Sequence, residues 1–227
     1  MIASCVGRLS LVLALATGAA CVPLAAGASA SRTAPASAVG ALPVLKGIPQ
    51  HGLWLGSRDA KVTLVEYVDV QCPYCGRFSR EVFPTVVRRY VRTGRVRVLL
   101  RGLAFVGPDS ATGLRWALAA GRQHRLWNVL EQLFASQGEE NSGWINAARL
   151  TSIARRVPGL ELAALRRDSA GADVGRQMRA AAEAAQRASV PGTPFFEAGR
   201  SLGDVAPLRL TSFDPLDFTS QLDKLLR

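Results

Sequence analysis

The chain has 227 residues, 48% of them hydrophobic, which is enough to bury the core of one domain with appendages. Its formal net charge is +11. A basic surface attracts acidic polymers or anionic lipids, but no nucleic-acid-binding motif accompanies this charge. We therefore interpret the arginines as solvated helix faces and expect no nucleic-acid partner.

The first thirty residues differ in composition from the rest. Arg8 precedes an apolar run from Leu9 to Ala20, and small residues such as Ala26-Gly27-Ala28 follow. This pattern is typical of a secretory signal peptide. An uncleaved membrane anchor and lipid attachment at Cys21 remain alternatives. All three place the remaining chain outside the cytosol (periplasmic, cell-envelope or secreted), where disulfides persist.

Residues 31–50 are rich in Ala, Ser and Pro without a period, which predicts a linker. The segment is too short to hold a separate dimerisation domain, so we expect a monomer. From residue 51 to residue 227 the pattern is that of a globular domain.

A strand and a helix meet at Cys72-Pro73-Tyr74-Cys75. β-branched and aromatic residues from Val62 to Val70 predict a buried strand. After the motif, apolar residues recur at helical spacing: Phe78, Val82, Val86 and Tyr90. Pro73 suits the first helical position, because its missing N–H would have no partner there. Both cysteines are therefore predicted in the first turn of a helix.

That position changes the chemistry of the two thiols. Cys72 faces the free N–H groups and the positive end of the helix dipole, which favour a thiolate. Cys75 lies one turn on, close enough to close a disulfide, and its deeper position keeps it protonated. The pair supplies an attacking and a resolving sulfur, as thiol–disulfide exchange requires.

Other roles for the cysteines are weaker. A zinc site needs four ligands, but the remaining cysteines, Cys5 and Cys21, lie in the leader, and the chain has only two histidines, His51 and His124. We therefore expect no metal. An inert structural disulfide is the second alternative, and closing so short a loop stabilises a fold very little.

Glu66 interrupts the apolar pattern of the strand before the motif. A buried carboxyl group there would have a raised pKa and could relay protons to or from the deeper thiol. The alternative is a glutamate on an edge strand that reaches solvent. The strand pattern alone does not decide between a buried and an exposed Glu66.

The rest of the chain predicts helices followed by a hairpin. Val96–Leu100 is expected as a strand, residues 101–108 as a loop, and Asp109-Ser110 as a helix N-cap. The expected helices are Leu114–Ala120, one around Trp127–Phe134, Asn146–Val157, Leu160–Arg167 and Ala172–Ala188, with Trp116, Trp127 and Trp144 in their core.

Two prolines around a glycine, in Val190-Pro191-Gly192-Thr193-Pro194, end this helical block. Thr193-Pro194 introduces a strand and is a candidate cis peptide. Residues 197–200 predict a hairpin turn, Leu208–Leu210 a return strand, and Pro215–Leu226 a closing helix.

From about Leu55 onward, the chain resembles the DsbA-like branch of the thioredoxin-fold oxidoreductases. The resemblance is carried by Val62-Thr63-Leu64-Val65-Glu66-Tyr67 before Gln71-Cys72-Pro73-Tyr74-Cys75, and by the later Val190-Pro191-Gly192-Thr193-Pro194. It implies an α/β thioredoxin fold, a central mixed β-sheet flanked by helices, with an all-helical insertion at about residues 109–189.

The resemblance also implies roles. Cys72 is the nucleophile, Cys75 resolves, Glu66 is the buried acid, Pro194 is cis and faces the disulfide, and the Thr193 backbone pairs with an extended substrate. The implied activity is disulfide exchange with exported proteins, with no cofactor beyond the Cys72–Cys75 disulfide, which a membrane partner resets. Oxidation of substrates is the favoured function. The alternatives are reduction of a dedicated partner and a non-catalytic peptide-binding or chaperone module.

One residue departs from the strongest oxidants of this family, which carry His between the cysteines where this chain has Tyr74 beside Pro73. A neutral tyrosine offers no cationic partner to the Cys72 thiolate. We therefore predict a less oxidising disulfide than a histidine-containing site would give.

Overall fold

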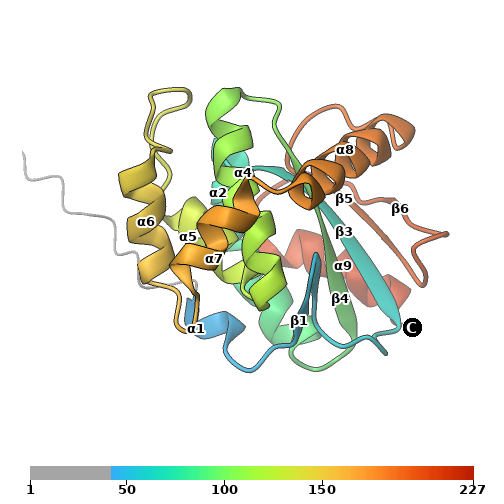
Figure 1. Ribbon diagram of the computed structural model, residues 1–227. Coiled ribbons are helices and arrows are strands. Elements are labelled where there is room, and N and C mark those ends of the chain that lie inside the picture. Colours follow the sequence, from blue (N-terminus) through green and yellow to red (C-terminus); the bar gives the residue numbers. More distant parts are fainter. Residues whose placement is uncertain (1–41) are drawn as a thin grey trace, which may run out of the picture. The chain divides into compact units, whose positions relative to one another are not determined.

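The computed structural model describes residues 42–227 (Figure 1). The predicted signal peptide or anchor, Cys21 and most of the predicted linker lie outside the described residues. Every helix within residues 42–227 is too short or too polar to cross a bilayer.

The sheet of the described domain has six strands in the order β1-β2-β4-β3-β5-β6. They are β1 Gln50–His51, β2 Trp54–Leu55, β3 Val62–Asp69, β4 Val96–Leu103, β5 Phe195–Gly199 and β6 Ala206–Pro207. β3 pairs parallel with β4 and antiparallel with β5, and the remaining pairs are antiparallel. The predicted mixed sheet is confirmed, and β3 and β4 are its two central strands.

Helices cover the sheet and fill the connection between β4 and β5. They are α1 Leu42–Leu45, α2 Pro73–Glu81, α3 Phe83–Val86, a π-helical turn Val87–Val91, α4 Pro108–Ala120, a 3-10 turn Gly121–Gln123, α5 Leu126–Ala135, α6 Ala147–Arg155, α7 Leu162–Ser169, α8 Ala172–Arg187 and α9 Pro215–Leu225. In Figure 1, α4 to α7 gather in one block, and α8 lies beside the sheet. The predicted helical insertion is confirmed.

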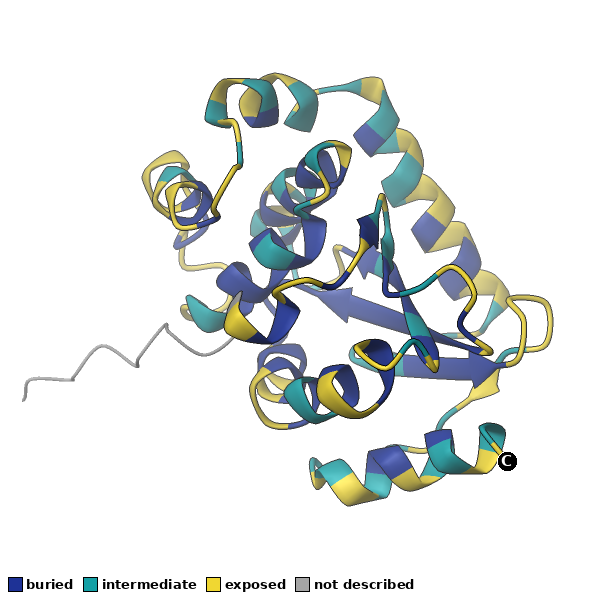
Figure 2. Cartoon of the chain, turned by 90° about the horizontal axis from the view of Figure 1, so that it is seen from below, coloured by how far each residue is buried: buried dark blue, intermediate teal, exposed yellow. Residues whose placement is uncertain are grey.

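Every residue of β3 is buried, in agreement with the dark blue strands at the centre of Figure 2. Alternate residues of β3 face two different cores. Leu64 and Val68 belong to the larger core, which also holds Cys72 and Cys75. The residues between them, such as Val65, pack in a smaller core against α8. Since side chains alternate along a strand, Glu66 faces the same side as Leu64 and Val68.

The linker ends earlier than predicted. Val44, Leu45 and Ile48 are buried in the core, although residues 42–50 were expected to belong to the linker. Arg92 donates hydrogen bonds to the carbonyls of Val44 at 2.6 Å and Lys46 at 3.0 Å. The apolar side chains in this Pro-containing segment therefore pack with the domain.

The connection from β4 to α4 also differs from the prediction. β4 continues to Leu103, since each residue of β3 has a partner on it, so the expected loop from residue 101 begins later. The Asp109-Ser110 cap is wrong: Gly107 is the N-cap and Pro108 begins the helix. The Ser110 hydroxyl instead donates to Asp69 Oδ1 at 2.6 Å.

The C-terminal hairpin is shifted. The predicted turn at residues 197–200 is wrong, because β5 continues to Gly199 and Glu197 accepts a buried hydrogen bond from the Tyr67 hydroxyl at 2.9 Å. The return strand is Ala206–Pro207 and not Leu208–Leu210. The closing helix is confirmed as α9. Trp127 and Trp144 are buried and Trp116 packs against the same core, as predicted.

Candidate active site

The two cysteines lie where β3 passes into α2. Cys72 is the N-cap of α2 and Pro73 occupies its first turn, as predicted. The Gly76 N–H donates to the Cys72 carbonyl at 3.1 Å, which closes that turn. Both thiols are free, with Cys72 6% exposed and Cys75 1% exposed. Cys72 is therefore the sulfur that a partner reaches first.

The pKa of Cys72 is lowered from 9.0 to about 6, mainly by a hydrogen bond with the Cys75 side chain. Burial opposes this shift. The Thr193 side chain and the backbone N–H groups of Cys75 and Tyr74 lower the pKa further. The acidic thiol was predicted, but the second cysteine contributes more to it than the start of the helix does.

Cys75 has the opposite character. Burial raises its pKa well above the usual value, and the shared hydrogen bond and charge of Cys72 raise it further. A sulfur that keeps its proton beside one that loses it is the arrangement predicted for a resolving and an attacking thiol.

The Thr193-Pro194 loop lies beside the cysteines. Its peptide bond is cis, as the sequence suggested. The Cys72 thiol donates a hydrogen bond to the Thr193 carbonyl oxygen at 3.1 Å. The next residue, Phe195, pairs with Tyr67 near the end of β3, so the sheet register holds the loop at this edge. The motif and the loop, far apart in sequence, form one site.

Glu66 is buried, with only 3% of its surface exposed. It stands opposite Leu100 of β4 and Phe196 of β5, so the edge-strand alternative is wrong. Its Oε2 atom is buried without a hydrogen-bond partner. Burial raises the pKa of Glu66 well above its usual value, and the nearby Glu131 carboxylate raises it further.

A polar network that was not predicted holds the motif in place. Asp69 Oδ1 accepts the Gln71 N–H at 2.8 Å. From the helical insertion, Gln137 Nε2 donates to the carbonyls of Val70 and Cys72, each at 2.9 Å. A Cβ at Gly76 would lie 1.9 Å from Gln137 Oε1, so a larger residue there would displace this amide. Gln137 lies far from the motif in sequence, so no local pattern points to it. Asp69 and Gln71 could have been noticed only because they lie next to the motif.

Aromatic and apolar side chains lie at the surface beside the start of α2. Tyr74 is 60% exposed, and its ring is parallel to that of Phe213 with centroids 6.2 Å apart. The Arg77 guanidinium lies 4.6 Å from the Phe213 ring centroid, and Leu216 is 67% exposed. These contacts join α2 to the segment that precedes α9.

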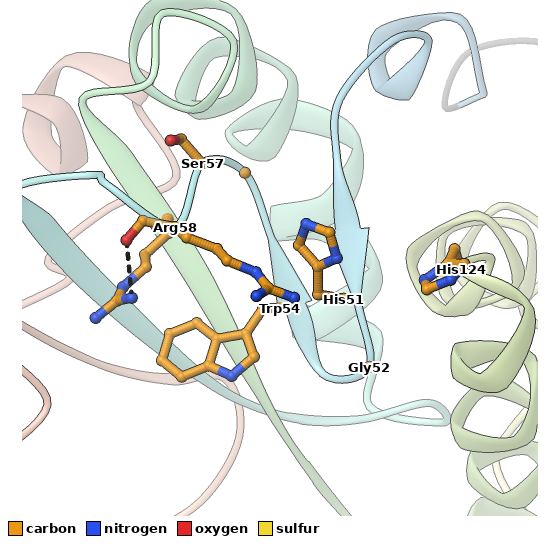
Figure 3. A pocket seen from close by; sticks show the side chains of 8 residues that line it. His51, Gly52, Trp54, Ser57, Arg58 and His124 are labelled. Atoms are coloured by element: carbon orange, nitrogen blue, oxygen red, sulfur yellow. Dashed lines mark hydrogen bonds between the residues drawn. The ribbon is translucent and has the colours of Figure 1, made fainter.

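A hollow of about 550 Å³ lies at the other end of the parallel strands, beside β1 and β2. Figure 3 shows the Arg58 side chain extending toward His51 and Trp54 there. None of the predicted site residues lines this hollow. Within residues 42–227, no group of three or more His, Cys, Asp or Glu side chains is arranged to hold a metal ion.

Comparison with known proteins identifies the family of this chain. The thioredoxin model matches residues 49–201. The chain belongs to the thioredoxin family. Over 143 residues, this thioredoxin-family chain is 27% identical to the probable disulfide bond formation protein D of Bacillus anthracis, a match that covers 62% of this chain and 66% of that relative.

Two solved structures share the fold. BdbD from Bacillus subtilis (oxidised) superposes with a TM-score of 0.66 at 20% identity, covering 79% of this chain and 97% of that one. Wolbachia pipientis alpha-DsbA1 gives a TM-score of 0.66 at 18% identity, over 80% of this chain and 92% of the other. The DsbA-like resemblance and its fold, a thioredoxin sheet with a helical insertion, are confirmed.

Proposed function

We propose that this thioredoxin-family protein is a protein disulfide oxidoreductase that works outside the cytosol through Cys72 and Cys75. The supporting observation is the contrast between the two thiols: the pKa of Cys72 is about 6, and that of the buried Cys75 is raised. The names of its relatives agree with this activity. The redox-active disulfide itself is the only prosthetic group this chemistry needs.

In the oxidising direction, a substrate thiolate attacks Cys72 Sγ of the disulfide. The Cys72–Cys75 bond breaks, and Cys75 leaves as a thiolate that takes up a proton. A second substrate thiolate then attacks the substrate sulfur of the mixed disulfide and releases the Cys72 thiolate. Two electrons pass from the substrate thiols to the cysteine pair. In the reducing direction, Cys72 attacks a substrate disulfide and Cys75 resolves the mixed disulfide.

We assign Glu66 to proton transfer at Cys75, because it is a buried acid on the sheet face that packs against both cysteines. The Thr193 backbone beside Cys72 is suited to pair with an extended substrate, and Pro194 shapes that loop. The exposed ring of Tyr74, stacked on the partly buried ring of Phe213, offers apolar contact to the same segment.

The acidic Cys72 favours oxidation of substrates over their reduction. A stabilised thiolate stabilises the reduced form, which makes the disulfide a stronger oxidant. An oxidase of this kind needs a membrane protein to reoxidise it, whereas a reductase would need one that supplies electrons. Residues 1–30 would export or anchor the domain beside such a partner.

The decisive experiment traps substrates in cells. With Cys75→Ala, mixed disulfides between Cys72 and exported proteins should accumulate, because the resolving thiol is missing. They should disappear in the Cys72→Ala/Cys75→Ala double variant. The single variant Cys72→Ala should lose oxidation of a dithiol peptide. Full biological activity of Cys72→Ala would refute the enzyme and favour a non-catalytic binding module.

Replacing Tyr74 with histidine should make the disulfide more oxidising. Tyr74 is exposed and neutral beside the Cys72 thiolate, whereas a histidinium would stabilise that charge. We expect the equilibrium constant with glutathione to shift about tenfold toward oxidation of glutathione, equivalent to ~30 mV. Tyr74→Phe serves as the control and should leave the constant nearly unchanged. An unaltered constant in Tyr74→His would refute the charge argument.

A further inference from the structure

A second buried carboxyl group lies near the site, on α5 of the helical insertion. Glu131 is 2% exposed. Its Oε2 accepts a hydrogen bond of 2.8 Å from the hydroxyl of Ser79. Disulfide exchange as described above assigns no role to either residue. Burying a carboxyl group that has a single hydroxyl partner lowers the stability of the fold. Its presence therefore points to a function.

Ser79 ties this acid to the helix that carries the cysteines. It follows Cys75 by four residues on α2, so the two side chains lie on one face, a turn apart. Both are buried. Ser79 therefore connects Glu131 to α2 at a position one turn from the resolving thiol.

Glu131 also acts on Glu66. Burial raises the pKa of both acids, that of Glu131 to about 8, and the Glu131 carboxylate raises the pKa of Glu66 further. The strands on either side of Glu66 present only Leu100 and Phe196, and α2 presents the hydroxyl of Ser79 to Glu131. Neither acid has a salt-bridge partner among residues 42–227.

Two buried carboxyl groups without a cation resist ionising together, so the pair retains a proton. The surroundings decide which acid keeps it. Glu131 accepts a hydrogen bond, which favours its charged form, whereas Glu66 Oε2 has no donor. The negative charge therefore settles first on Glu131 and the proton stays on Glu66.

We propose that Glu131 and Glu66 form one buried carboxyl pair in which the charge of Glu131, held to α2 by Ser79, keeps a proton on Glu66 for transfer to Cys75 once Glu131 has ionised. Glu131 is a positioning residue, since it acts through Glu66. The proposal rests on the proton-transfer role assigned to Glu66 in the proposed function. When the Cys72–Cys75 bond breaks, the proton on Glu66 passes to the Cys75 thiolate, and the pair is left with one more negative charge.

The test is the Glu131→Gln variant, which keeps the shape of the side chain and removes its charge. The titration of Glu66 is followed by carboxyl NMR or by infrared absorption of the protonated group, with Glu66→Gln used to assign the signal. We expect it to move to lower pH by about one unit, the scale at which two sites titrate as a pair. The pH above which the rate of Cys75 release falls should shift to lower pH by the same amount.

The exposed Glu183→Gln on α8 removes one negative charge far from the pair and should change neither quantity. An unmoved Glu66 titration in Glu131→Gln overturns the pair, and a moved titration with an unmoved rate profile overturns its link to Cys75. Because the titration needs no turnover, a shift in a protein without exchange activity would refute the proposed function and leave the carboxyl pair standing.

Discussion

The reduced protein is expected to gain about 2.5 kcal/mol in free energy of unfolding between pH 5 and pH 8 through Cys72. The pKa of this thiol is about 6 in the folded protein, against an ordinary value of 9.0. Because the folded pKa is the lower one, the stabilisation is complete only above the unfolded pKa. It is lost as the pH falls through the folded pKa.

Urea unfolding of the reduced wild type, the oxidised wild type and reduced Cys72→Ala, at several pH values, measures this gain. Only the reduced wild type should show it, because the other two forms lack the titrating thiol. Glu66 and Glu131 have raised pKa values and oppose the trend, but they do so in all three forms and cancel in the differences. Cys75 titrates above this window.

Parallel stability curves for the three forms would contradict the acidic thiol and the oxidase proposed from it. A widening gap between the reduced and oxidised curves would support both. The gap measures how strongly folding favours the reduced form, and a protein that is more stable when reduced is a stronger oxidant.

The site was most predictable where the chemistry is local in sequence. The β-branched run of β3, the proline after Cys72 and the helical spacing from Phe78 lie within a few residues of one another. Their order sufficed to place both thiols at the start of a helix and to rank their acidity. The local pattern already made Thr193-Pro194 a candidate cis peptide. The resemblance to DsbA-like proteins added its position beside the disulfide, which no local pattern would have predicted.

The errors and omissions come from contacts between distant residues. Residues 197–200 have the composition of a turn, but Glu197 lies in a strand, where it accepts a hydrogen bond from Tyr67, 130 residues away. Gln137 and Glu131 are unremarkable polar residues of a helical block until the fold sets them against α2. Burial against a distant segment has no signature in a short window of sequence.

Replacing Glu66 with leucine should stabilise the protein and slow the exchange reaction. Glu66 Oε2 is buried without a partner, and an unsatisfied buried polar group costs about 1–3 kcal/mol. Its folded pKa is raised, so the wild type loses stability as the pH rises above the unfolded value of 4.5. The advantage of Glu66→Leu should therefore grow from pH 5 toward neutral pH, while release of Cys75 slows for want of a proton donor.

Glu197→Leu is the matched control, since Glu197 is also a buried glutamate on the sheet but accepts the Tyr67 hydroxyl at 2.9 Å. Its loss leaves that hydroxyl without an acceptor and should destabilise the protein by about 1–3 kcal/mol. Changes of opposite sign in the free energy of unfolding, measured with urea, would show that Glu66 destabilises the fold whereas Glu197 stabilises it. If Glu66→Leu instead lost stability and kept the wild-type rate, Glu66 would be a packing residue, and the proton for Cys75 would have to come from solvent.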